Sequence, residues 1–87
     1  MDRIKVLLVD DHPLMRAGLM ETLARGPALE VVGEATDGVE ALDLTVELQP
    51  EVILMDLRLP NMDSIEATKR IKSTNPHISV IILTVYD

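Results

Sequence analysis

Four short apolar runs, separated by segments with helical spacing, restrict the fold more than any other feature of this chain. The runs consist mainly of β-branched and aliphatic residues and occupy Ile4–Val9, Glu30–Glu34, Val52–Met55 and Ile78–Leu83. Continuous runs of this kind are typical of parallel strands that are buried on both faces. Strands that alternate with helices are joined by right-handed crossovers. The sequence therefore predicts an α/β protein with a doubly wound parallel sheet of about four strands and three helices.

Proline, glycine and capping residues set the expected helix boundaries. The first helix begins near Pro13, with Asp10, Asp11 and His12 as possible caps, and ends around Gly26. The second helix is expected to open after Asp37-Gly38 and to end before Pro50, and the third to open near Asp63-Ser64 and to stop at Asn75-Pro76. The residues that these helices carry are Leu14, Ala17, Leu19, Met20, Leu23 and Ala24 in the first, Val39, Leu42, Val46 and Leu48 on one face of the second, and Ile65, Thr68, Ile71 and Lys72 in the third.

Length and composition exclude several classes of protein. Eighty-seven residues suffice for one small domain at most, and the absence of cysteine excludes both a disulfide framework and a thiolate metal site. The longest apolar stretches, of four to six residues, are too short for a membrane span, and no signal peptide precedes them. We therefore expect a cytoplasmic protein that does not enter a membrane.

The charge balance argues against nucleic acid as a direct partner. The formal net charge is -7, whereas binding to phosphate backbones depends on Lys and Arg. Tyr86, the one aromatic residue, offers no platform on which bases could stack. An acidic chain is better suited to a cation or to a basic protein partner.

Three of the apolar runs end in polar residues that can take part in phosphate chemistry. Asp10 and Asp11 follow the first run, Asp56 follows the third, and Thr84 follows the fourth. The carboxyl ends of strands in an open parallel sheet share one edge, so these side chains are expected to converge. Crowded carboxylates are unfavourable unless they are protonated or neutralised by a cation, and oxygen ligands in small number favour Mg²⁺ over zinc. Asp56 would then be a nucleophile that forms an acyl phosphate.

Each of these residues also has a structural explanation when taken alone. An Asp before a helix is a common cap, and the segment from Asp56 to Pro60 can form an ordinary turn. Thr84 alone is a β-branched residue in a strand, and His12 and His77 are expected to be plain loop residues. The joint placement of the acids and the threonine after successive strands favours the functional interpretation.

The sequence resembles the receiver domain of two-component response regulators, most closely those of the NarL/FixJ (LuxR) type. The pair of acids, an Asp-x-x-x-Pro segment and the threonine occur in the family's order, each at the end of a predicted strand. The matching stretches are Val6–Leu14, Gly33–Ala41, Val52–Pro60 and Ile81–Thr84. The resemblance implies a flavodoxin-like (CheY-like) fold with strand order 2-1-3-4-5.

The resemblance also implies a role for each matching site residue. Asp56 would accept a phosphoryl group from a sensor histidine kinase, and Asp10 and Asp11 would help to hold Mg²⁺. The metal would also bind Asp56 and the backbone carbonyl of Arg58. Thr84 would be the switch hydroxyl that carries the signal away from the phosphorylated aspartate. A protein of this kind assists its own phosphorylation and dephosphorylation and is not an enzyme in the ordinary sense.

The chain departs from the family pattern in one large respect. A family Lys at the end of a fifth strand has no counterpart here, because Lys5, Lys69 and Lys72 lie elsewhere. We therefore expect residues 1–87 to be the N-terminal portion of a receiver domain. The rest of the receiver, and a DNA-binding output domain that regulates transcription, would belong to a longer parent.

Two smaller departures lie in the loop that follows Asp56, where the family commonly has glycine at the positions of Asn61 and Ser64. Asn tolerates a left-handed backbone and Ser can cap a helix, so we expect both to be accommodated.

An uncovered fourth strand predicts self-association. Without a fifth strand, residues 78–85 form an uncharged β-branched edge, and such edges pair readily with other chains. The simplest product is a homodimer joined through its fourth strands.

Two other functions compete with the phosphoacceptor. One is a non-catalytic receiver fragment that self-associates. The other is a Mg²⁺-dependent phosphatase of the haloacid-dehalogenase type, which needs Asp-x-Asp after the first strand, whereas Asp10 and Asp11 are adjacent.

Overall fold

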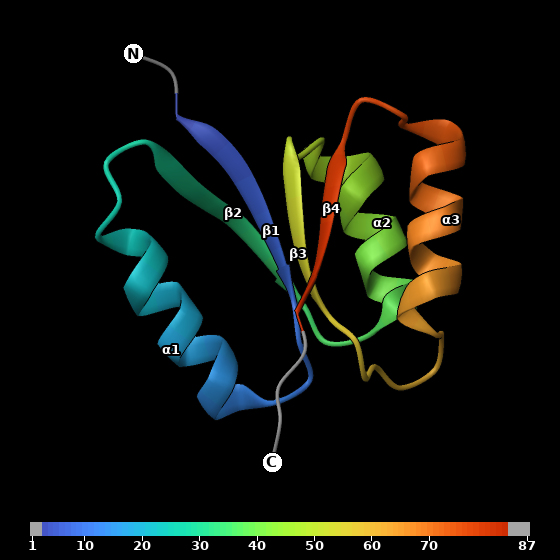
Figure 1. Cartoon of the computed structure of the whole chain (residues 1–87), viewed down its shortest axis with the longest axis horizontal. Coiled ribbons are helices and arrows are strands. Elements are labelled where there is room, and N and C mark those ends of the chain that lie inside the picture. Colours follow the sequence, from blue (N-terminus) through green and yellow to red (C-terminus); the bar gives the residue numbers. More distant parts are fainter. Residues whose placement is uncertain (1–2, 84–87) are drawn as a thin grey trace.

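Strands and helices alternate along the chain as the apolar runs predict (Figure 1). The structure is a computed structural model that describes residues 3–83. Its elements in order are β1 (Ile4–Val9), α1 (Pro13–Ala24), β2 (Leu29–Ala35), α2 (Gly38–Leu48), β3 (Val52–Asp56), α3 (Ser64–Thr74) and β4 (Ser79–Leu83). The observed β2 is one residue longer at each end than the predicted strand, β3 extends to Asp56, and β4 begins one residue later than predicted. Within residues 3–83, no helix has the length and apolarity that a membrane crossing requires.

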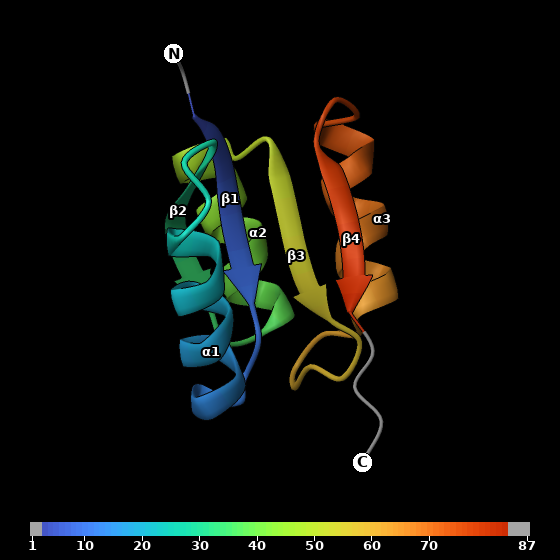
Figure 2. The same cartoon turned by 60° about the vertical axis from the view of Figure 1, so that its left-hand side comes forward.

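The four strands form one parallel sheet in the order β2-β1-β3-β4. From β1 the chain adds β2 at one edge of the sheet, and it then crosses over to add β3 and β4 on the other side of β1. Helix α1 consequently lies on one face of the sheet, and α2 and α3 lie on the opposite face (Figures 1 and 2). The reversal falls between β1 and β3, where open α/β sheets bind their ligands. In the register of this pair, Val9 lies opposite Met55. The next residues along each strand, Asp10 and Asp56, are therefore brought side by side.

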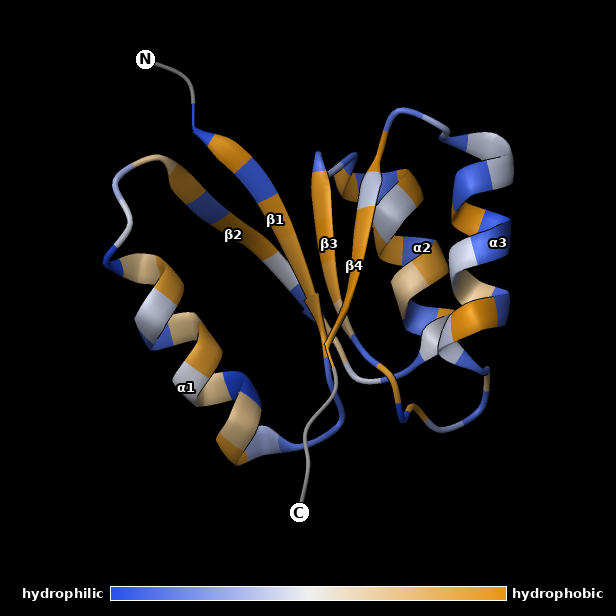
Figure 3. Ribbon diagram, in the orientation of Figure 1, coloured by the Kyte–Doolittle hydropathy of each residue, from blue (hydrophilic) through white to orange (hydrophobic). Residues whose placement is uncertain are grey.

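The hydrophobic core lies between the sheet and the two helices α2 and α3. Its buried members come from every strand except β4 and from both helices, together with Ile78 just before β4. They are Leu7, Val9, Ala35, Ala41, Ile53, Met55, Ala67, Ile71 and Ile78. Leu, Ile and Met supply most of the buried volume, as expected of a chain without Phe or Trp. Figure 3 shows the apolar strands at the centre of the molecule and the mixed hydrophilic and hydrophobic residues of α3.

The opposite face of the sheet is less completely covered. In residues 3–83, α1 is the one helix on this face, it packs mainly against β2, and none of its residues is buried. Leu19, Met20 and Leu23 are half-buried, whereas Leu14 is exposed. The apolar side chains of α1 are therefore only partly used in packing. On the far side of the same face, Ile81 of β4 is exposed to 48%.

The buried face of α2 is the predicted one only in part, since Leu42 and Leu48 pack against the core as expected. The helix buries Gly38, Ala41 and Thr45, while Val39 and Val46 are exposed. Small side chains let the helix approach the sheet closely, and the Thr45 hydroxyl donates to the carbonyl oxygen of Ala41, so its burial leaves no unpaired donor. Side-chain size and hydrogen bonding therefore decide which face is buried, although valine is the more hydrophobic residue.

The same effect applies to α3. Ser64, Ala67 and Ile71 are buried, whereas Ile65 is exposed. Of the two isoleucines of this helix, Ile71 therefore lies on the inner face and Ile65 on the outer one.

Capping interactions fix the starts of α2 and α3. Asp37 Oδ1 accepts from the backbone N–H of Glu40 at 2.7 Å, and Glu40 Oε1 accepts from the N–H of Thr36 at 2.9 Å. Asp63 Oδ1 accepts from the N–H of Ile65 at 2.6 Å and is the cap of α3. The expectation that Ser64 caps α3 is therefore wrong, because Ser64 is already the first helical residue.

The start of α1 has a different design. Pro13 occupies the first helical position, where a missing N–H costs nothing, and the N-cap residue His12 makes no side-chain cap. Asp10 Oδ1 instead accepts from the backbone N–H of His12, ahead of the helix. The carboxylates of the β1–α1 loop therefore remain available for a site at the edge of the sheet.

Candidate acidic site at the carboxyl ends of β1 and β3

The acidic site combines two buried carboxylates with two exposed side chains. Asp10 and Asp56 are 3% and 8% exposed, whereas Asp11 and His12 lie at the surface. One potential ligand atom of each of the four lies within 4.8 Å of the others. The predicted convergence of Asp10, Asp11 and Asp56 is thus present in the structure. Thr84 falls outside the described residues.

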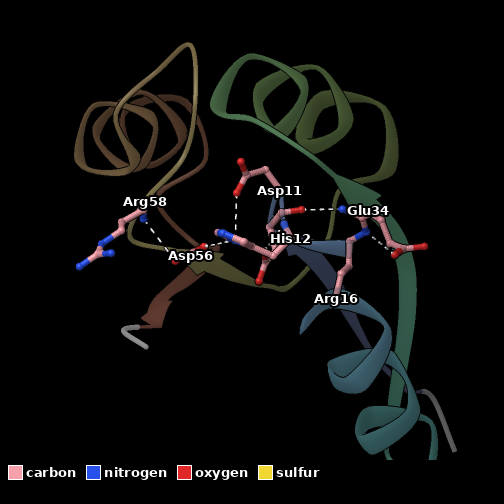
Figure 4. Close-up of polar contacts among 7 residues, drawn as sticks. Asp11, His12, Arg16, Glu34, Asp56 and Arg58 are labelled. Atoms are coloured by element: carbon pink, nitrogen blue, oxygen red, sulfur yellow. Dashed lines mark hydrogen bonds and ion pairs between the residues drawn. The ribbon is translucent and has the colours of Figure 1, made fainter. Parts of the chain in front are cut away.

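His12 contacts all three carboxylates, and Figure 4 shows its ring between Asp11 and Asp56. Its Nδ1 atom is 3.1 Å from Asp11 Oδ1, 3.3 Å from Asp10 Oδ1 and 3.4 Å from Asp56 Oδ2. The charge of Asp11, together with a hydrogen bond to Asp10, raises the pKa of the imidazole. The ring nitrogen therefore stands where a cation would contact all three acids. Sequence reasoning missed this contact, although the position of His12 directly after two acids could have indicated it.

The main chain of Asp10 is held from two sides. Its N–H donates to the carbonyl of Ala35 at 2.9 Å, and its own carbonyl accepts from Arg16 Nη1 at 2.7 Å. Arg16 is fixed in turn by Glu34 of β2, which lies 2.9 Å from its Nε atom (Figure 4). These contacts leave the carboxylate of Asp10 as the group that faces the site, and the sequence analysis did not anticipate Arg16 or Glu34.

The loop after β3 is anchored at both ends. Asp56 Oδ1 accepts from the backbone N–H of Arg58 at 3.2 Å. The N–H of Leu57 donates to the carbonyl of Leu83 at 3.0 Å, and the Ser64 hydroxyl donates to the carbonyl of Leu57 at 2.8 Å. The loop is therefore joined to β4 and to the first turn of α3, which limits where the backbone of Arg58 can lie.

The donor set suits a hard divalent cation. Carboxylate oxygens from Asp10, Asp11 and Asp56 are gathered at the mouth of the site, and Mg²⁺ prefers a few such oxygens supplemented by water and phosphate oxygens. Two of the carboxylates are buried, so their mutual repulsion is only weakly screened by water. A bound cation would offset that repulsion, and the residues present therefore fit the group that the resemblance implies.

Comparison with known proteins identifies the family. Residues 6–87 match the response regulator receiver domain. The chain belongs to this family. It is 52% identical over 81 residues to the transcriptional regulatory protein LiaR of Bacillus subtilis, and 45% identical over 83 residues to the response regulator protein VraR of Staphylococcus saprophyticus. These alignments cover 93% and 95% of the chain but 38% and 40% of the relatives, so the chain spans about two fifths of their length.

Solved structures of response regulators share the fold. A LuxR-family two-component response regulator from Aurantimonas superposes with a TM-score of 0.91 at 37% identity, covering 99% of this chain and 61% of that one. The signal receiver domain of the putative response regulator NarL from Mycobacterium tuberculosis gives a TM-score of 0.91 at 34% identity, covering all of this chain and 70% of that one. Both the predicted family and the predicted receiver fold are confirmed.

Proposed function

We propose that this chain is a phosphoacceptor module that receives a phosphoryl group on Asp56 from a sensor histidine kinase. Receiver domains serve in phosphorelay signalling and are not classical enzymes, which is the general role of the family. The single observation that carries the proposal is the position of the Asp56 carboxylate, buried next to Asp10 and within 4.8 Å of the remaining acidic ligand atoms.

The transfer requires a nucleophile, a leaving group and charge neutralisation. A carboxylate oxygen of Asp56 attacks the phosphorus atom, the bond from phosphorus to the donor's imidazole nitrogen breaks, and the released imidazole takes up a proton. One oxygen of Asp56 accepts from Arg58 N–H and the other faces His12. Held by Asp10, Asp11, Asp56 and the Arg58 carbonyl, Mg²⁺ would neutralise the charge that gathers on the phosphoryl oxygens.

The output of the module is proposed from the relatives. LiaR is a transcriptional regulatory protein, and we propose that this chain controls transcription in the cytoplasm through an output domain of a longer parent. The charge of -7 argues against DNA contact by the chain itself. In this proposal Thr84 acts as the switch hydroxyl.

Intact mass spectrometry after incubation with acetyl phosphate tests the phosphoacceptor. The wild type should gain one phosphoryl group in the presence of Mg²⁺ and none in its absence, and Asp56→Asn should gain none. Asp43→Asn, an equivalent change on the exposed surface of α2, is the matched control and should behave as the wild type.

Other results would redirect the assignment. A gain that persists in Asp56→Asn would contradict the proposed nucleophile. No gain by a folded protein would favour the non-catalytic receiver fragment, and continuous hydrolysis of a free phosphoester would favour the phosphatase.

Self-association through β4 is a second proposal, and the sheet supports it. Within residues 3–83, β4 pairs with β3 alone and carries the exposed Ile81. Such an edge presents unpaired N–H and C=O groups to a second copy. Sedimentation velocity over a range of concentrations should reveal a dimer that Ile81→Lys weakens. Val46→Lys, at a more exposed apolar position on α2, should leave it unchanged. A wild type that sediments as a monomer at high concentration would exclude the proposal.

A further inference from the structure

The loop between β3 and α3, residues 57–63, is tied to the start of α2 by one side-chain hydrogen bond. Asn61 Nδ2 donates to Asp37 Oδ2 at 2.7 Å, joining positions 24 residues apart. The other oxygen of Asp37 accepts from the N–H of Glu40 at the helix cap. These hydrogen bonds lower the pKa of Asp37, chiefly through Glu40 and then through Asn61, so the acceptor is an ionised carboxylate. One side chain therefore caps α2 and holds the loop at the same time.

The backbone of Asn61 supports this assignment. Its φ of 68° lies in the left-handed region, which residues with a Cβ atom adopt rarely and asparagine adopts more readily than most. Gln49 is the other non-glycine residue with positive φ in the described part of the chain, and it ends a helix, where this conformation is common. Asn61 ends no helix and lies instead at the centre of a tight turn, so its side chain is presented from a defined backbone conformation.

A backbone contact next to Asn61 joins the same two segments. A Cβ atom added to Gly38, the first residue of α2, would lie 2.7 Å from Met62 Cβ and 2.8 Å from the Met62 carbonyl oxygen. The N–H of Met62 also donates to the carbonyl of Pro60 at 2.7 Å, which makes the loop a tight turn at this point. The contact at Gly38 and the hydrogen bond to Asp37 thus fix adjacent residues of the loop against adjacent residues of α2.

This tie bears on the acidic site because the loop is short. Arg58, whose N–H donates to Asp56 Oδ1, precedes Asn61 by three residues. A second side-chain contact, from the Ser64 hydroxyl to the Leu57 carbonyl, holds the first residue of the loop. The hydrogen bond of Asn61 therefore restrains the part of the loop from which the Arg58 backbone reaches the site.

We propose that Asn61 is a positioning residue which, through Asp37, holds the β3–α3 loop so that the backbone of Arg58 is oriented for cation binding and phosphoryl transfer at Asp56. The inference rests on the proposed function and extends it to a pair of residues outside the acidic cluster.

Four variants separate this role from a merely structural one. Asn61→Gly removes the amide and keeps a residue that accepts positive φ, whereas Asn61→Asp places two carboxylates together. The double exchange Asp37→Asn/Asn61→Asp restores the hydrogen bond with its direction reversed, and the amide oxygen introduced at position 37 can still cap α2. Glu40→Ala is the matched control, since it weakens the same helix start through the Thr36 N–H and leaves the Asp37 contact intact.

The Mg²⁺ dissociation constant, from calorimetric titration, is the first readout, and amide hydrogen exchange of residues 57–63 is the second. Asn61→Gly and Asn61→Asp should each raise the dissociation constant by about tenfold, the usual effect of losing an outer contact that orients a ligand. Both should speed exchange in the loop. The double exchange should return both readouts to within about twofold of the wild type. Glu40→Ala should lower the midpoint of urea unfolding but should change neither the Mg²⁺ dissociation constant nor the amide exchange of the loop.

The outcomes distinguish this inference from the proposed function. Wild-type affinity and wild-type exchange in both single variants would overturn the positioning role of Asn61, as would a double exchange that rescues nothing. A wild type that binds Mg²⁺ but takes no phosphoryl group on Asp56 would refute the proposed function and leave the positioning role in place. If the wild type binds no Mg²⁺, unchanged exchange in Asn61→Gly overturns the inference and faster exchange supports the restraint.

Discussion

Replacing Gly38 by alanine should destabilise the protein, although helix propensity alone predicts the opposite. Gly38 is the first residue of α2, and alanine in place of glycine stabilises a helix by roughly 0.5–1 kcal/mol. The new methyl group would lie 2.7 Å from Met62 Cβ and 2.8 Å from the Met62 carbonyl oxygen, closer than real Cβ contacts allow. Overpacking of this kind costs about 1–3 kcal/mol. The expected net loss is roughly 1 kcal/mol, and at most about 2.5 kcal/mol.

Gly18 provides the matched comparison. It lies within α1, and no heavy atom would come within 4 Å of an added Cβ atom. Gly18→Ala should therefore stabilise the protein by roughly 0.5–1 kcal/mol, because the gain in helix propensity is opposed by no contact.

Urea unfolding followed by far-ultraviolet circular dichroism measures both effects. The midpoint should move down for Gly38→Ala and up for Gly18→Ala, with equal slopes. In thermal scans each kcal/mol corresponds to roughly 4–8 °C for a domain of this size. If Gly38→Ala were as stable as the wild type, the Met62 backbone would be free to move away, and the argument from close approach would be refuted.

Three further predictions follow from the core, the cap of α2 and the acidic site. Ile71→Ala should lower the free energy of unfolding by about 2–5 kcal/mol because Ile71 is buried. Ile65 is 54% exposed, so Ile65→Ala should lower it by less than about 1 kcal/mol. Equal losses in urea unfolding would contradict the assigned face of α3. Hydrogen bonds lower the pKa of Asp37 in the folded protein. The ionised Asp37 carboxylate therefore stabilises the fold above its ordinary pKa of 3.8, and this stabilisation is lost as the pH falls through the folded-state pKa. Asp37→Asn should remove this part of the acid dependence of the urea midpoint. Mg²⁺ at a hundredfold excess over its dissociation constant should increase the free energy of unfolding of the wild type by up to about 2.7 kcal/mol and so raise its thermal midpoint. A chelator should reverse the rise, and Asp10→Asn should show a smaller one. A thermal midpoint that is independent of Mg²⁺ would argue against the metal site.

The elements and their order could be predicted because their signals are local. Pro13 marks the start of α1, Asp37 caps α2, and short aliphatic runs define each described strand to within one or two residues. The convergence of Asp10 and Asp56 also followed from the chain alone, since parallel strands place their carboxyl ends at one edge. These inferences need only the periodicity of the backbone and the topology of crossover connections.

Contacts between distant segments depended on the packed structure. Which face of α2 is buried was decided by the small size of Ala41 and the internal hydrogen bond of Thr45, because close approach of helix and sheet outweighs the greater hydrophobicity of Val46. The contacts of His12 with Asp56 and of Asn61 with Asp37 have no periodic signal in the sequence. They arise where loops that lie far apart in the chain are brought within hydrogen-bonding distance, and that distance is set by the layers of the fold as a whole.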